Sequence, residues 1–204
     1  MATLGRGAAR TGIGGNMNTA LLVIDVQQSF LHRPYWRDED QPAFRARLLE
    51  LIAGCRARGV PVLHVLHEEP GSGGPFDPAS GYVRELDWLP AGSEAVFRKR
   101  VYSALVDGGL REWLEARRIT RLIVSGIRTE QCCETTTRHA SDLGFEVVYV
   151  TEATLTFPMT HASGRLYTAA EIRERTETVL AGNFARVATV VEALAVLDAS
   201  PAAA

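Results

Sequence analysis

Three side chains of complementary chemistry stand where predicted strands end: the carboxylate of Asp25, the ammonium of Lys99 and the thiol of Cys132. A free thiol with a pKa of about 8.5 is only a few per cent thiolate at neutral pH. A helix N-terminus and a nearby ammonium both favour the thiolate, and a carboxylate can take up the thiol proton and return it to a leaving group. The trio therefore predicts nucleophilic catalysis by Cys132.

Each of these residues also has an ordinary structural interpretation. An Asp after a strand often caps a turn, a lone Lys is commonly solvated, and a Cys at a helix start commonly fills core space. Cys133 is a rival nucleophile, but adjacent helical residues point about 100° apart, so the two thiols cannot share one role. The convergence of three groups at strand ends favours the catalytic interpretation.

The elements that must position these groups alternate along the chain. Short apolar runs predict strands at 20–24, 60–66, 95–97, 121–125, 145–150 and 185–190. Longer periodic segments predict helices at 42–58, 105–116, 131–143, 169–180 and 191–197. Continuous apolar strands between helices are typical of a parallel sheet covered on both faces. We therefore expect an α/β protein, a three-layer α/β/α fold with a doubly wound, six-stranded, mostly parallel sheet and a ligand site at the carboxyl ends of its strands.

Composition excludes several other classes of protein. The 204 residues include 22 Lys and Arg against 24 Asp and Glu, a net charge of −2 that gives no case for nucleic acid or a membrane surface as partner. Three cysteines do not make a disulfide framework, which together with the absence of a signal-like segment predicts a cytoplasmic protein. We expect a flexible N-terminal tail at 1–16, a single domain at 17–198 and a loose C-terminal tail at 199–204.

Three ordered motifs resemble those of the isochorismatase-like cysteine hydrolases, whose fold is Rossmann-like. They are D-x-Q-x-x-F from Asp25 to Phe30, K-x-x-Y-S-A-L from Lys99 to Leu105, and G-I-x-T-x-x-C from Gly126 to Cys132. The match runs in order from about Asn18 to Leu197. Each motif alone is weak, but the ordered set is specific for the superfamily and says little about the substrate.

The resemblance implies a role for each residue of the trio. Asp25 would be the general base and acid, Lys99 its electrostatic partner and Cys132 the nucleophile. The resemblance also implies a non-proline cis peptide before Arg128, with the backbone N–H groups of Arg128 and Cys132 forming an oxyanion hole. The side chains expected near the substrate are Gln27, Phe30, Trp36, Tyr102, Arg128 and Thr129.

Two departures from family patterns bear on the reaction. Nicotinamidases of this family hold a metal in an Asp/His cluster after the second strand, where this chain reads HVLHEEPGSGG. His64 and His67 are three residues apart and would point to opposite faces of a strand, so we expect no metal and no other cofactor. The retained Cys132 favours hydrolysis of a small-molecule amide through an acyl-enzyme. Vinyl-ether hydrolysis of isochorismate and a non-catalytic binding protein remain alternatives.

The substrate itself is not apparent from the sequence. The long segment 67–93, rich in Gly and Pro, is expected to shape the pocket, since long loops in compact domains are usually functional or mobile. The resemblance also implies a homo-oligomer, in which a neighbouring subunit could complete that pocket.

Overall fold

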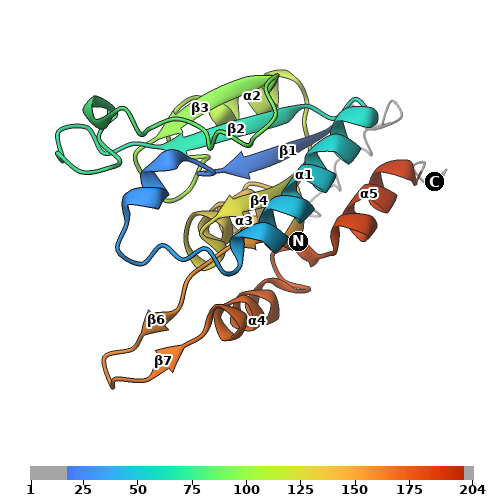
Figure 1. The fold of residues 1–204 in the computed structure, drawn as a ribbon. Coiled ribbons are helices and arrows are strands. Elements are labelled where there is room, and N and C mark those ends of the chain that lie inside the picture. Colours follow the sequence, from blue (N-terminus) through green and yellow to red (C-terminus); the bar gives the residue numbers. More distant parts are fainter. Residues whose placement is uncertain (1–17, 200–204) are drawn as a thin grey trace, which may run out of the picture.

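A computed structural model describes residues 18–199, so the predicted tail 1–16 and all but the first residue of the tail predicted at 199–204 lie outside the described residues. Six strands form one parallel sheet in the order β3-β2-β1-β4-β5-β8 (Figure 1). They are β1 (Thr19–Ile24), β2 (Val62–His67), β3 (Ala95–Lys99), β4 (Arg121–Ile127), β5 (Glu146–Leu155) and β8 (Arg186–Val187). Because β2 and β3 lie on one side of β1 and β4 on the other, the strand order reverses between β1 and β4. Ligands of doubly wound sheets bind at this point.

Helices cover both faces of the sheet. They are α1 (Gln41–Ala57), α2 (Leu110–Ala116), α3 (Glu134–Asp142), α4 (Ala169–Leu180) and α5 (Val190–Asp198). Side chains alternate along β1: Leu21 and Val23 pack in one apolar core with α1 and α5, whereas Leu22 and Ile24 pack in a second core with α2 and α3. This alternation is the pleat of a strand buried on both sides. The expected three-layer fold is therefore confirmed.

Several boundaries differ from the expected ones. Helix α2 begins five residues later than predicted, because Gly108 and Gly109 both have positive φ angles, 80° and 79°, and turn the chain. A Cβ at Gly108 would lie 2.0 Å from the carbonyl oxygen of Arg98, so this turn rests directly on β3. Strand β5 extends to Leu155 rather than residue 150, and β8 is shorter than expected.

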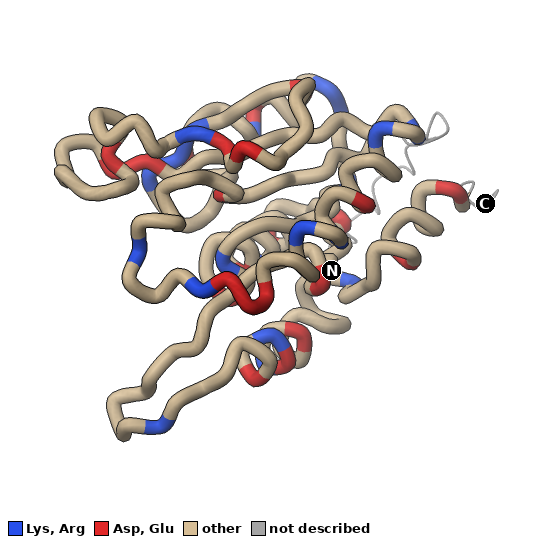
Figure 2. The backbone as a smooth tube through the Cα atoms, viewed as in Figure 1, with Lys and Arg blue, Asp and Glu red and all other residues tan. Residues whose placement is uncertain are grey.

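Two further short elements escaped prediction. A hairpin of β6 (Met159–Thr160) and β7 (Leu166–Tyr167) projects from the body of the molecule (Figure 1). Strands of two residues carry too little periodicity to be recognised. Lys, Arg, Asp and Glu are interspersed along the chain (Figure 2), in keeping with the near-zero net charge.

The segment 67–93 is tied to the chain that follows β1. Short 3-10 helices occupy Gln28–His32 (η2) and Pro78–Ser80 (η3). The hydroxyl of Ser29 donates to the carbonyl of Tyr82 at 3.0 Å, and a β-bridge pairs Gln27 with Glu85. These contacts hold the long segment against the carboxyl ends of β1 and β2.

Candidate active site

Asp25, Lys99 and Cys132 meet at the carboxyl edge of the sheet, as their positions in the sequence predict. Lys99 Nζ lies 2.8 Å from Asp25 Oδ2 and 3.3 Å from Cys132 Sγ. The carboxylate follows β1, the ammonium ends β3, and the thiol lies in the helical turn after β4. The side chains of Lys99 and Asp25 are each 1% exposed and Cys132 is 7% exposed. The ion pair and the thiol thus form one compact buried group.

The end of β1 is held in an unusual backbone conformation. Asp25 has a φ of 55°, in the left-handed region that Asp tolerates better than most residues, and its N–H donates to the carbonyl of Val65 at 2.7 Å. On the other side, Gly126 of β4 approaches β1 so closely that a Cβ would lie 2.0 Å from the carbonyl oxygen of Ile24. The glycine that opens G-I-x-T-x-x-C therefore lets β4 and the carboxylate-bearing strand meet.

The segment carrying the thiol begins with a cis peptide between Ile127 and Arg128, as the resemblance implies. Arg128 precedes a π-helical turn, η4 (Thr129–Cys133), which continues into α3. The carbonyl of Arg128 accepts from the N–H of Cys133 at 3.3 Å. Donors at the start of a helix lack partners in the preceding turn, so this is a place where backbone N–H groups can meet an anion.

The electrostatics of the thiol differ from the sequence-based expectation. Burial is the largest influence and raises the pKa of Cys132 well above its ordinary value, and the charge of Asp25 raises it further. Lys99 lowers the pKa of Cys132, but not enough to offset burial. Burial also lowers the pKa of Lys99, yet the charges of Asp25 and Cys132 outweigh it and raise that pKa overall. Burial and the charge of Asp25 therefore oppose the thiolate that Lys99 alone would favour.

Asp25 has a free acceptor for the thiol proton. Its Oδ2 accepts from Lys99, whereas its Oδ1 is buried and has no hydrogen-bond partner among the described residues. A carboxylate oxygen has two lone pairs, and leaving it unpaired in a buried site costs free energy. This oxygen is thus an unpartnered acceptor on the carboxylate that shares Lys99 with Cys132.

His67 is a member of the site that sequence reasoning missed. Its Nδ1 lies 3.4 Å from Lys99 Nζ, and its Nε2 lies 3.4 Å from Glu69 Oε1. An ammonium has three N–H donors, and Lys99 thus faces three acceptors: Asp25, Cys132 and His67. The sequence suggests His67 only as a possible metal ligand, although its place at the end of β2, beside β3, is a signal for contact with Lys99.

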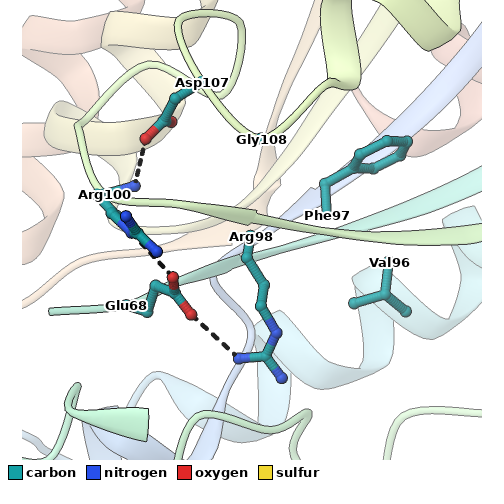
Figure 3. Close-up of a pocket in the computed structure, with 7 residues that line it drawn as sticks. All are labelled: Glu68, Val96, Phe97, Arg98, Arg100, Asp107 and Gly108. Atoms are coloured by element: carbon teal, nitrogen blue, oxygen red, sulfur yellow. Dashed lines mark hydrogen bonds and ion pairs between the residues drawn. The ribbon is translucent and has the colours of Figure 1, made fainter. Parts of the chain in front are cut away.

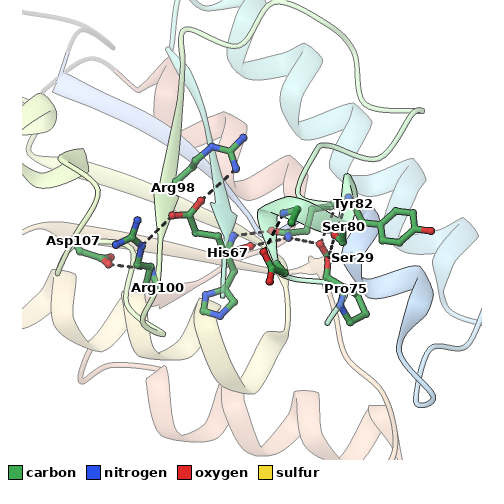
Figure 4. Close-up of polar contacts among 12 residues, drawn as sticks. Ser29, His67, Pro75, Ser80, Tyr82, Arg98, Arg100 and Asp107 are labelled. Atoms are coloured by element: carbon green, nitrogen blue, oxygen red, sulfur yellow. Dashed lines mark hydrogen bonds and ion pairs between the residues drawn. The ribbon is translucent and has the colours of Figure 1, made fainter. Parts of the chain in front are cut away.

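Gln27 holds His67 in place through its side-chain amide. Its Oε1 accepts from the N–H of His67 at 2.7 Å, and its Nε2 donates to the carbonyl of His67 at 2.9 Å. The same Nε2 also donates to Ser29. Figure 4 shows His67 between this group and the ion pairs of Arg98 and Arg100. Both N–H donors of the buried Gln27 amide are satisfied within the protein, and its expected contact with a ligand stays a prediction.

Three other residues predicted to contact the substrate lie in different surroundings. Thr129 is buried, its hydroxyl within 2.8 Å of Thr154 Oγ1 and its carbonyl bound by Tyr149. Phe30 is packed in the core, edge-on to Phe76. Tyr102 is 61% exposed, because residues 101–107 form turns instead of the expected helix start. Their expected contacts with a substrate stay predictions.

Trp36 and Arg128 remain beside the site in an aromatic setting. Trp36 packs on Phe157 with ring centroids 5.2 Å apart. The guanidinium of Arg128 lies over the ring of Tyr35 and pairs with Glu130 at 2.8 Å. Both residues therefore stay candidates for contact with a substrate.

The donor set does not fit the metal cluster of nicotinamidases. His64 is buried with its Nδ1 2.5 Å from Glu85 Oε1, and burial lowers its pKa. His67 points instead to Lys99. Within residues 18–199, no three His, Cys, Asp or Glu side chains gather in a way that could hold a metal ion.

A separate cavity of about 610 Å³ lies along the edge strand β3 (Figure 3). Glu68 lies there between two arginines, 3.5 Å from Arg98 and 3.0 Å from Arg100, and Asp107 accepts from the N–H of Arg100. The charges that line this cavity largely compensate one another, and no residue of the buried trio lines it.

In the part of the chain that the structure describes, no helix has the length and apolar character of a membrane span.

A buried Cys–Asp–Lys group at the point where the strand order of a doubly wound sheet reverses can support nucleophilic catalysis of the kind that cysteine hydrolases use. The chain belongs to the isochorismatase family and is a hydrolase: the family model, described as the isochorismatase domain, matches residues 19–187. The chain is 32% identical to nicotinamidase 3 of Arabidopsis thaliana over 157 residues, 68% of this chain and 73% of that protein. It is 35% identical to streptothricin hydrolase of Streptomyces noursei over 144 residues, 68% of this chain and 50% of that protein. An isochorismatase from Pseudomonas putida has a similar structure, with a TM-score of 0.78, 29% identity, and coverage of 87% of this chain and 91% of that one.

Proposed function

We propose that this protein is a metal-independent cysteine amidohydrolase that cleaves a C–N amide bond of a small molecule through a thioester acyl-enzyme. The observation that carries the proposal is Lys99 Nζ, within hydrogen-bond distance of both Asp25 Oδ2 and Cys132 Sγ. Relatives named for the hydrolysis of nicotinamide and of streptothricin give it support.

Acylation begins with proton transfer from the thiol of Cys132 to Asp25, whose Oδ1 is free to receive it. The resting thiol avoids the cost of a buried anion, and the thiolate forms only as it attacks the amide carbonyl. Lys99 stabilises the negative charge, which moves from the carboxylate to the sulfur. The N–H groups of Arg128 and Cys132 hold the oxyanion of the tetrahedral intermediate.

The second half of the cycle reverses the proton transfers. Asp25 donates its proton to the departing nitrogen, the C–N bond breaks, and the amine or ammonia leaves a thioester on Cys132. Asp25 then takes a proton from water, whose oxygen attacks the thioester carbonyl. Collapse of this second intermediate releases the carboxylic acid, and the proton returns to the thiol. No step needs an oxidant, a reductant or a metal.

A screen of small amides with detection of released ammonia tests the proposal. Turnover is expected in the wild type and absent in Cys132→Ala, and hydroxylamine should trap the acyl group as a hydroxamate. Prior dialysis against a chelator should leave the rate unchanged. Pyruvate release from isochorismate without any amide turnover, or activity that chelation abolishes and zinc restores, would contradict the proposal. A homo-oligomer and a cytoplasmic location remain predictions.

A further inference from the structure

Beside the buried trio, two arginines flank one aromatic ring. Arg33 lies with its guanidinium carbon 5.4 Å from the ring centroid of Tyr35 and 5.9 Å from that of Phe76. Arg128 lies 4.9 Å from the centroid of Tyr35 and 5.8 Å from that of Phe157. These five residues are called the arginine–aromatic cluster below.

The cluster adjoins the trio from two directions. Phe76 packs against the ring of His67 at a centroid distance of 5.6 Å, and His67 contacts Lys99. From the other side, Arg128 begins the helical turn that carries Cys132. A small molecule with its carbonyl at Cys132 therefore lies beside this cluster.

The charges of the cluster are only half compensated. Arg128 is 8% exposed along its side chain and pairs with Glu130, which is held in turn by Thr156. Arg33 has no acidic partner among the described residues. The Nε of each arginine is buried and has no hydrogen-bond partner among those residues. A buried donor left unpaired costs free energy, so each Nε favours an acceptor.

We propose that the arginine–aromatic cluster binds a carboxylate on the substrate, so that the preferred substrates are small amides bearing an acidic group. The inference rests on the proposed amidohydrolase function. Guanidinium groups recognise carboxylates through paired N–H donors, and the aromatic faces hold them in place at little conformational cost. The rings of Tyr35 and Phe157 supply an apolar wall for the carbon chain between the two groups.

Paired substrates test the preference directly. Succinamate and glutaramate each carry one amide and one carboxylate, and the diamides succinamide and glutaramide are their neutral partners. We expect kcat/KM for ammonia release to be at least tenfold higher for the acids. Arg33→Met and Arg128→Met should each reduce this preference about tenfold, mainly through KM. Arg33→Lys keeps the charge without the Nε donor and should lose part of the preference for acids over diamides. If Arg33→Met folds poorly, Arg33→Lys therefore still tests the role of Arg33.

Arg117→Met is the matched control, because Arg117 is also stacked on an aromatic ring, 3.9 Å from the centroid of Trp113, but follows α2, away from the cluster. It removes the same charge and should leave the preference unchanged. Equal kcat/KM for acids and diamides, or a preference that neither Arg33 nor Arg128 affects, would overturn the proposal while leaving the amidohydrolase function intact.

A binding measurement separates the two proposals. Glutarate, which has no amide, should slow the alkylation of Cys132 by iodoacetamide in the wild type but not in Arg33→Met. That result without turnover of any amide would support the carboxylate site and contradict the amidohydrolase function. Absence of protection by glutarate up to high millimolar concentrations would contradict the carboxylate site.

Discussion

Lys99 Nζ lies 2.8 Å from Oδ2 of Asp25, and both side chains are almost completely buried. The desolvation of two charges offsets much of their attraction, so a buried ion pair is weak evidence for stability. This pair instead bears on the chemistry of the thiol, because the ammonium of Lys99 also lies within hydrogen-bond distance of Cys132 Sγ. Its members shift the pKa of that thiol in opposite directions, which makes their separate contributions measurable.

Asp25→Asn should separate proton transfer from thiol ionisation. The carboxylate raises the pKa of Cys132, so its removal should lower that pKa and move the pH profile of alkylation by iodoacetamide to lower pH. Turnover should nevertheless fall by about 10²–10⁴-fold, because the base is lost. Circular dichroism checks that the variant is folded. An unshifted alkylation profile with nearly full turnover would contradict the role of Asp25.

Lys99→Met should have the opposite effect on the thiol. Lys99 lowers the pKa of Cys132, so the variant should need higher pH to reach the same alkylation rate. It also leaves Asp25 buried without its cation, which costs about 3–5 kcal/mol of stability and should appear as a lower urea midpoint. If the alkylation profile coincides with that of the wild type, Lys99 does not tune the thiol.

The three thiols should differ in their rates of alkylation. Burial raises the pKa of all three thiols above the usual range, so accessibility decides the order of reaction, and Cys55 and Cys133 are each 0% exposed. Cys132 is slightly exposed and has Asp25 as a local base. Mass spectrometry after limited treatment with iodoacetamide should find the label on Cys132 first. Preferential labelling of Cys133 would shift the nucleophile by one residue.

His67 should act through the orientation of Lys99. His67→Leu removes the Nδ1 acceptor and leaves one buried N–H of the ammonium unpaired, which should lower kcat about tenfold with little change in KM. His67→Asn places an amide oxygen near the same point and should recover most of that loss. Equal defects in the two variants would indicate that His67 only fills space against Phe76.

Gly126→Ala tests the close approach of β4 to β1. The new methyl group would meet the carbonyl of Ile24 at 2.0 Å, at a φ of 126° that L-residues avoid. Gly144→Ala is the matched control, since its φ of 87° is also unfavourable but nothing lies within 4 Å of the added Cβ. The control should cost about 1–3 kcal/mol of unfolding free energy. Urea denaturation should show a clearly larger loss of unfolding free energy for Gly126→Ala. Equal urea midpoints for the two variants would contradict the close approach of β4 to β1.

The sequence alone determined the fold class and the edge of the sheet at which the chemically active residues meet. Apolar runs and helical periodicity are local properties, so they indicated the six strands and the five main helices. Since parallel strands share one carboxyl edge, the positions of Asp25, Lys99 and Cys132 after their strands already implied that the three would meet. The motif match added the cis peptide at Arg128.

Only the tertiary structure decided which polar atoms find partners. His67 contacts Lys99, and the amide of Gln27 is hydrogen-bonded to the backbone of His67. Arg33 and Arg128 both lie over the ring of Tyr35. These contacts join segments that are far apart in the sequence. The pKa of Cys132 likewise depends on burial, which opposes Lys99 and prevails. Desolvation and hydrogen-bond satisfaction are properties of the packed site, and no local pattern of residues encodes them.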